Sequence, residues 1–385
     1  MEKMTYEELR KFLKNTKKYP NCKKYPRAPL IHKGFPGTFN LSFTEYDMLK
    51  EFGGYSDFSH DLIFSTTQSC IRPQDILENI REGNDLWKYL GVFEMSDIGG
   101  QIVLSEKNDI EKVHAWQLNR LIEILVELGL KKENIYPSYQ AGGKVSKITA
   151  GKYNFDFKIP EDKFTKELFI KEGIPWKNLI PDETRDTFLS LHINMQTPWG
   201  YRNEINYNIG TKKNPKFLDI ATLEYFLWYP TYSSKKKVAK NINGLQDIIL
   251  TVSVGGIGVE RLYMAINGLK NIQEVDYLKK FYDLFKILYP KLTEKQRIKS
   301  GEALRALHRI FSDKEIYKIE SLGRNRKLKV KLFIRIIIEN IKEINQEKLK
   351  NLLELHSKVQ PWHKELKKGI QPTIDRIKRY YQSQK

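Results

Sequence analysis

The stretch Gly255-Gly256-Ile257-Gly258-Val259-Glu260-Arg261 marks a change of pattern in this chain of 385 residues. It follows an apolar, strand-like run at residues 248–254 and leads into residues with helical spacing. Glycines let a backbone approach a ligand closely, and a helix N-terminus favours anions. The stretch has neither the Gly-Lys-Ser/Thr of a Walker loop nor the later glycine of a dinucleotide fingerprint. Taken alone, a tight packing turn between a strand and a helix explains it equally well.

A second stretch, Thr66-Thr67-Gln68-Ser69-Cys70-Ile71-Arg72-Pro73-Gln74-Asp75, carries an arginine at the end of a strand-like run. A guanidinium in this position can meet a phosphate or a carboxylate through two parallel hydrogen bonds. The simpler alternative for Arg72, taken alone, is an ordinary surface or structural ion pair.

Short strand-like runs dominate the first part of the chain. They cover residues 61–67, 92–95, 153–159, 187–195, 204–208 and 248–254, with helical spacing at residues 6–14 and 111–130. Because strands and helices do not alternate regularly, the pattern favours an α+β fold with an antiparallel sheet flanked by helices. After residue 275 the clear spacing is helical, at residues 302–311, 328–344 and 346–355. We therefore expect two domains, 1–275 and an all-helical 276–385.

Most of the positive charge lies in the second of these regions. The chain has 66 Lys and Arg against 47 Asp and Glu, a formal net charge of +19. Residues 276–385 hold 28 basic and 13 acidic residues, which places +15 there and leaves +4 in residues 1–275. Such an excess is typical of polyanion binding, although a lysine-rich composition alone also produces it.

The composition excludes several classes of protein. With 40% hydrophobic and 12% aromatic residues, the chain is neither disordered nor dependent on disulfides for its core. Its two cysteines, Cys22 and Cys70, lack the spacing of a metal or redox pair, which favours a reducing compartment. The sequence has no apolar run of membrane-spanning length and no signal-like core in residues 1–10. We expect a soluble, cytoplasmic protein without membrane contact.

Taken in order, these segments resemble the class II aminoacyl-tRNA synthetases. Residues 256–261 fit the family's motif 3, Gly-x-Gly-x-Glu-Arg, and Arg72 fits the arginine of its motif 2. The alanyl-tRNA synthetases are the most similar branch. The matching segments, in chain order, are Cys70-Ile71-Arg72, Phe93-Glu94-Met95, Asn203-Glu204-Ile205-Asn206-Tyr207-Asn208, Phe217-Leu218-Asp219-Ile220-Ala221-Thr222 and Ser321-Leu322-Gly323-Arg324-Asn325. The resemblance covers about residues 60–345, and motif 1 is not evident.

The resemblance implies a class II synthetase fold and a role for the two arginines in catalysis. Arg72 would bind the α-phosphate of ATP and the substrate carboxylate, and Arg261 the γ-phosphate and the adenine. Phe93 would stack on the adenine with Met95 beside it, although a core strand pair explains Met95 as well. The full ATP-binding set that the resemblance implies is Arg72, Asp75, Phe93, Met95, Gly256, Gly258 and Arg261. Glu204 and Asp219 would be ligands for Mg²⁺, or alternatively structural ion-pair partners.

The chain departs from the family around the amino acid. The family binds the substrate's ammonium with an aspartate just before motif 3, where this chain reads Val252-Ser253-Val254-Gly255. Glu224, two residues beyond Thr222 on the same strand, would face the same side and replace that carboxylate, unless it is simply exposed. Trp199 could reshape the pocket, although a packed core aromatic is an equally good explanation. The expected amino-acid site comprises Thr222, Glu224, Trp199 and Val254.

The family's later domains have no counterpart here. The sequence has no His-x-x-x-His with a downstream Cys and His, so we expect neither zinc nor editing. A basic stripe for tRNA is expected at Arg324, Arg326, Lys327, Lys329, Lys331 and Arg335, with a solvated helix face as the alternative.

The resemblance implies a ligase that activates a small amino acid, alanine or a relative, with ATP and Mg²⁺ and transfers it to tRNA. One alternative is a paralogue that adenylates an acid for another acceptor, and a second is an inactive RNA-binding paralogue. We expect a monomer. We also expect that a chain without residues 276–385 loses RNA binding but keeps adenylation, if the remaining part folds.

Overall fold

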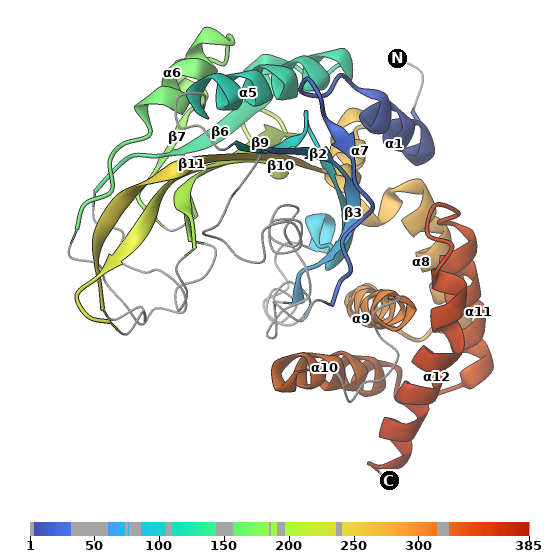
Figure 1. Ribbon diagram of the computed structural model, residues 1–385. Helices are drawn as coiled ribbons and strands as arrows, with labels where there is room; N and C mark the ends of the chain where they lie inside the picture. Colours follow the sequence, from blue (N-terminus) through green and yellow to red (C-terminus); the bar gives the residue numbers. More distant parts are fainter. Residues whose placement is uncertain are drawn as a thin grey trace.

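A computed structural model describes residues 4–31, 61–73, 76, 86–104, 110–143, 157–184, 186–190, 197–235, 241–313 and 323–384. The fold is mixed α+β, as expected: a long curved sheet carries helices on its convex face, and the C-terminal helices gather at one end of it (Figure 1).

Long antiparallel strands form the centre of the sheet. These are β9 (Trp199–Asn208), β10 (Phe217–Tyr232) and β11 (Ile242–Gly258), which pair in that order. Along the main path the sheet runs β1-β2-β5-β11-β10-β9-β6-β7. Its remaining members are β1 (Lys23–Lys24), β2 (Leu62–Ser65), β5 (Gln101–Leu104), β6 (Ile135–Gln140) and β7 (Ile180–Asp182).

The sheet is mixed, so the expectation of a purely antiparallel sheet was wrong at its margins. The pair β1 and β2 is parallel at one edge, and the pair β6 and β7 is parallel at the other. Three further strands lie off the main path. These are β3 (Thr67–Ile71), β4 (Val92–Asp97) and β8 (Phe188–Ser190). Strand β4 pairs with β3 and with the end of β11, and β8 pairs with β9.

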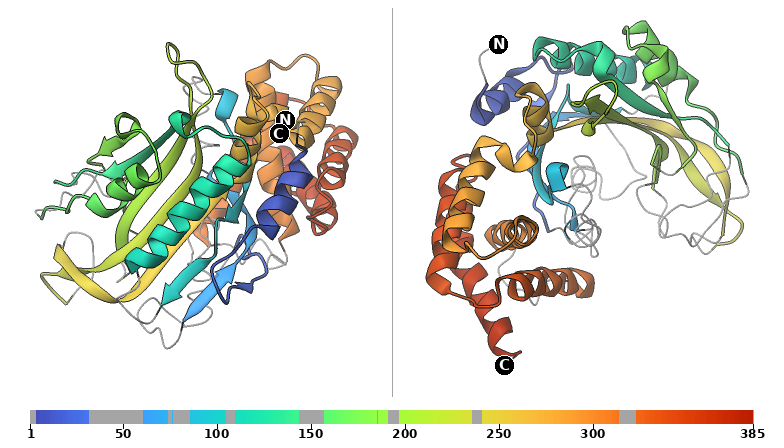
Figure 2. Two further views of the ribbon diagram at one scale, coloured as in Figure 1. Left: turned by 90° about the horizontal axis from the view of Figure 1, so that it is seen from above. Right: turned by 180° about the vertical axis from the view of Figure 1, so that it is seen from behind.

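Helices α5 (Ile110–Glu127) and α6 (Lys163–Lys171) cover the convex face of the sheet, as the two further views confirm (Figure 2). The helix α5 forms because its apolar residues recur at helical spacing, and Leu118, Leu121 and Leu125 are fully buried in the main core. Helices α1 (Tyr6–Asn15) and α7 (Val259–Ile266) complete this core near the end of β11. Short 3-10 helices occur at Leu86–Lys88, Lys132–Asn134, Trp176–Asn178 and Ile272–Glu274.

The C-terminal region is helical, as expected. It contains α8 (Asp276–Leu288), α9 (Glu294–Ser312), α10 (Arg324–Ile341), α11 (Gln346–Lys358) and α12 (Leu366–Gln382). The central helix is α9, in which every residue from Ser300 to Ser312 is buried. A capping box formed by Thr293 and Gln296 fixes its start.

A second hydrophobic core joins these helices to the sheet. Ile71 of β3 and Val92 of β4 belong to the same buried cluster as Phe281, Leu304 and Ile334. The strands that carry Arg72 and Phe93 are therefore packed against the C-terminal helices. Two expected strands fall largely outside the described residues: only 157–159 of 153–159 and 187–190 of 187–195 are described.

Candidate functional site

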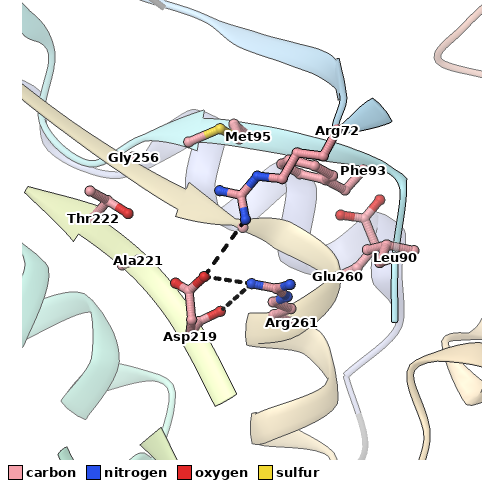
Figure 3. Close-up of a pocket in the computed structure, with 11 residues that line it drawn as sticks. Arg72, Leu90, Phe93, Met95, Asp219, Ala221, Thr222, Gly256, Glu260 and Arg261 are labelled. Carbon is pink, nitrogen blue, oxygen red and sulfur yellow. Dashed lines mark hydrogen bonds and ion pairs between the residues drawn. The ribbon is translucent and has the colours of Figure 1, made fainter. Parts of the chain in front are cut away.

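A pocket lies where β3, β4, β10 and the start of α7 meet. It holds about 360 Å³ of space, part of which is open to solvent. Eleven residues line it: Arg72, Leu90, Phe93, Met95, Asp219, Ala221, Thr222, Gly256, Gly258, Glu260 and Arg261 (Figure 3). The structure thus brings together eight residues that the sequence analysis had singled out in four separate segments.

Two arginines converge on one carboxylate in this pocket. The Nη1 atom of Arg261 lies 2.5 Å from Oδ2 of Asp219 and also donates to that residue's carbonyl oxygen at 3.4 Å. Nη1 of Arg72 lies 4.0 Å from the same Oδ2 atom (Figure 3). Arg72 follows the last residue of β3, and Arg261 stands in the first turn of α7. Two guanidinium groups that share one carboxylate oxygen can also bind an oxygen of a phosphate or of another carboxylate.

The aromatic wall of the pocket comes from β4. Phe93 and Met95 are half-buried, while Glu94 between them is buried on the other face of the strand, as the period of two requires. The Cζ atom of Arg72 lies 5.2 Å from the centre of the Phe93 ring, a cation–π distance. The pocket therefore offers a flat apolar face directly beside a positive charge.

The glycines of the 255–261 stretch play different structural roles: one packs the sheet against a helix, and two line the pocket. A Cβ atom on Gly255 would come within 2.8 Å of Oε1 of Gln117 on α5, so this position packs sheet against helix. A Cβ atom on Gly258 would meet nothing closer than 3.8 Å. Gly256 and Gly258 line the pocket, where the lack of side chains keeps the end of β11 open to a ligand. Gly258 also caps α7, although its backbone angles are ordinary.

A row of polar side chains continues from the pocket along β9 and β10. Register places Thr222 opposite Glu204 and Glu224 opposite Arg202, so these four side chains share one face. The hydroxyl of Thr222 donates to Oε2 of Glu204 at 3.0 Å, and Nε of Arg202 donates to Oε1 of Glu224 at 2.8 Å. Glu224 thus faces the expected side but already has a cationic partner.

Glu204 and Asp219 provide a negative region beside the two arginines. Burial and the neighbouring charge of Asp219 raise the pKa of Glu204 to about 8, against the opposing charges of Arg202 and Arg72. A second carboxylate that opposes the ionisation of Glu204 fits a site for a divalent cation, which prefers oxygen ligands. Within the described ranges no three or more His, Cys, Asp or Glu side chains form a cluster that would hold a metal ion alone. A Mg²⁺ ion here would take its other ligands from phosphates and water.

Among the described residues, the expected site residues Val254 and Trp199 do not line the pocket, and Glu204 and Glu224 lie in the row beside it. Val254 lies cross-strand from Glu224 on the same face but is not part of the lining. Trp199 is fully buried in a cluster with Phe188 and Tyr201, its ring centre 5.7 Å from that of Phe188, so the expectation that it shapes the pocket was wrong. The alternation of β9 turns it to the face opposite Arg202. Asp75 lies outside the described residues.

A buried polar network that the sequence analysis missed lies behind β4. Glu260 accepts hydrogen bonds from the hydroxyls of Tyr6 and Tyr277 at 2.9 and 2.7 Å. Burial and the charge of Glu94 raise the pKa of Glu260 to about 7. Burial also opposes ionisation of Glu94, but His363 and Arg10 outweigh it and lower the pKa of Glu94. In the sequence, Glu260 of the 255–261 stretch was the one sign of this buried network.

The contacts of Glu94 reach two distant parts of the chain. Arg10 holds its carboxylate with two hydrogen bonds, of 2.6 and 3.0 Å, and Nε2 of His363 lies 2.9 Å from its Oε1 atom. The other histidines of the helical region, His308 and His356, are buried with their Nδ1 atoms 2.8 Å apart. These two histidines are core residues.

The expected basic stripe on α10 divides between two faces. Arg324, Lys331 and Arg335 are exposed and recur at helical spacing on one face, and half-buried Lys327 lies beside them. Arg326 is buried and Lys329 half-buried, and burial lowers the pKa of both. A phosphate backbone that lies along α10 would therefore meet four of the six residues.

A scan against protein-family models finds no match to this chain, and a search of curated proteins finds no relative. Within the described part of the chain no helix has both the length and the apolar character to cross a membrane.

Proposed function

We propose that this protein activates a small amino acid with ATP, as an aminoacyl-adenylate, and transfers it to tRNA. The observation that carries the proposal is the convergence of Arg72 and Arg261 in one pocket, beside the Phe93 ring and the open glycine edge of β11. This combination suits a nucleotide: a flat apolar face for the base and two guanidinium groups for the phosphates.

Positioning and charge stabilisation would carry the adenylation step. An oxygen of the substrate carboxylate attacks the α-phosphorus, and pyrophosphate leaves with the electrons of the broken phosphorus–oxygen bond. In this proposal Arg72, next to Phe93, binds the α-phosphate and the attacking carboxylate, and Arg261 binds the terminal phosphate of a bent ATP. Both arginines now face Asp219, so an incoming phosphate would replace its carboxylate as their partner.

Glu204 and Asp219 are the residues that would hold Mg²⁺. The ion would supply positive charge to the phosphates during the displacement. The protein's own part is to keep both carboxylates on one face of β9 and β10, near the end of the pocket that Arg261 lines.

The amino-acid end of the site would lie along the Arg202 and Glu224 row. Glu224 would receive the ammonium group, and Thr222, two residues before it on the same face of β10, lines the pocket. The existing Arg202–Glu224 pair also favours a second candidate, adenylation of a carboxylic acid without an ammonium group. Such a substrate would leave that pair intact, at 2.8 Å.

An ATP–pyrophosphate exchange screen tests the proposal. The full chain is assayed with each amino acid and a set of carboxylic acids, with and without unfractionated tRNA. We expect exchange with one small amino acid and a loss of at least about 100-fold in Arg72→Ala, which removes a transition-state contact. Lys163→Ala, on exposed α6, is the control for loss of a positive charge. Absence of exchange with every acid would leave the inactive RNA-binding paralogue as the better account.

A further inference from the structure

A second, larger hollow lies on the helical region, away from the pocket of Figure 3. It encloses about 1260 Å³, including space open to solvent, at the junction where α11 ends and α12 begins. Its nine lining residues are Glu354, Ser357, Lys358, Gln360, Pro361, His363, Lys364, Lys367 and Ile370, which we call the α11–α12 groove. The two helices lie side by side at the outer end of the molecule in both directions of view (Figure 2).

The groove carries more positive than negative charge. Lys358, Lys364 and Lys367 are exposed, and within the described part of the chain none of them takes part in an ion pair. The one acidic lining residue, Glu354, lies 3.9 Å from Lys350, which partly balances it. Three lysines without acidic partners around one hollow attract an anion with several charges.

The floor of the groove is polar and already ordered. His363 and Gln360 are buried and held by hydrogen bonds to Glu94 and to the carbonyl oxygen of His356. The hydroxyl of Ser357 is buried and has no hydrogen-bond partner within the described residues. Pro361 and Ile370 add apolar surface beside the lysines. Ordered polar groups, apolar surface and exposed lysine side chains together suit a sugar-phosphate chain better than a bare ion.

We propose that the α11–α12 groove is a binding site for an RNA strand, with Lys358, Lys364 and Lys367 on successive phosphates. This rests on the proposed function, which supplies an RNA partner, but it places the contact on residues beyond the α10 stripe. The volume of the groove exceeds that of one phosphate group, and the region that contains it carries +15 of the chain's formal charge.

Salt dependence of RNA binding tests the site. Labelled unfractionated tRNA is titrated with the full chain, by fluorescence anisotropy, between about 50 and 200 mM KCl. The groove variant is Lys358→Gln, Lys364→Gln and Lys367→Gln together. The matched control carries Lys163→Gln, Lys171→Gln and Lys177→Gln, three exposed lysines of the sheet region. Urea unfolding of both triple variants checks that each folds as the wild type does.

The slope of log K against log salt is negative. Loss of three phosphate contacts should make it less steep by about 2 in the groove variant only. A fourfold rise in salt then weakens its binding about 20-fold less than that of the wild type. Equal slopes for the groove variant and the wild type would overturn the proposal. So would equally tight, groove-dependent binding of polyglutamate, because an acidic polypeptide would then be an equal ligand.

The two proposals fail separately. If the wild type shows no pyrophosphate exchange but the groove variant loses its share of the salt slope, the adenylation proposal falls and the groove stands. If the wild type shows exchange and the groove variant has the same salt slope as the wild type, the groove proposal falls and the adenylation proposal stands.

Discussion

At the scale of single residues, the face of β9 and β10 beside the pocket decides which substrate fits. Arg202 and Glu224 bind each other at 2.8 Å, and Glu204 accepts from Thr222. These charged groups are half-buried, so a change in any of them alters the electrostatics of the neighbouring pocket more than a surface charge would.

Replacement of Glu224 by Gln should weaken binding of an amino acid through its ammonium group. We expect the KM for the amino acid in pyrophosphate exchange to rise by about 10-fold or more, the loss of one charge-assisted hydrogen bond. The KM for ATP should change little, because Glu224 does not line the nucleotide pocket. Unchanged values for both substrates would show that the ammonium group binds elsewhere.

Replacement of Glu204 by Gln should change how stability depends on pH. The pKa of about 8 in the folded protein lies above the usual value, about 4.3, so the folded state binds a proton that the unfolded state releases. The contribution of Glu204 to stability is complete below the usual value and is lost as pH rises toward 8. The free energy of unfolding of Glu204→Gln relative to the wild type should therefore increase from pH 5 to pH 8.

Urea unfolding at several pH values measures this difference. Glu167→Gln, exposed on α6, is the control for removal of a carboxylate. A difference between Glu204→Gln and the wild type that stays constant with pH would contradict the raised pKa.

At the scale of elements, α9 holds the strand that carries the aromatic wall. The carboxylate of Glu302 accepts from the backbone N–H groups of Gly91 and Val92 at 2.9 and 3.2 Å. Arg305, paired with Glu302, donates to the carbonyl oxygen of Val92 at 2.9 Å. Because both side chains are almost completely buried, this pair fixes the residues just before Phe93.

Replacement of Glu302 by Gln should leave Arg305 as a buried, uncompensated charge. We expect the free energy of unfolding to fall by about 3 to 5 kcal/mol, as for other broken buried pairs. Asp283→Asn breaks the exposed Lys279–Asp283 pair on α8 and should cost less than about 1 kcal/mol. Urea unfolding of both variants makes the comparison, and losses of equal size would show that the Glu302–Arg305 pair adds no stability of its own.

At the scale of the whole molecule, the pocket depends on both ends of the chain. Arg10 of α1 and His363, just before α12, hold Glu94 from two sides, and the second core contains Ile71 and Val92. The boundary at residue 275 thus cuts through a shared core.

A chain that ends at residue 275 should therefore lose the pocket as well as RNA binding. Ile71 and Val92 would each lose about 1.5 to 3 kcal/mol of apolar burial, and Glu94 would lose His363. We expect no cooperative thermal transition in circular dichroism and no pyrophosphate exchange, against the expectation that adenylation survives if the shortened chain folds. A cooperative transition with full exchange activity would show that the sheet region is self-sufficient.

The sequence by itself determined the local elements and the residues of the pocket. Periodicity predicted α1, α5, β4 and, in the C-terminal region, α9, α10 and α11, because each has an apolar face whose spacing is a local property. The resemblance of their segments to the class II synthetases implied one site for Arg72, Phe93, Asp219 and Arg261, and these residues do line one pocket.

Only the tertiary structure decided which side chains meet. The register of β9 with β10 sets Glu224 opposite Arg202, so that the two form an ion pair. The alternation of side chains along β9 turns Trp199 into the core. The contact of Glu94 with His363 joins residues 269 positions apart. Such pairings follow from packing and from the burial of charge over the whole chain, and a local pattern of residues carries no record of them.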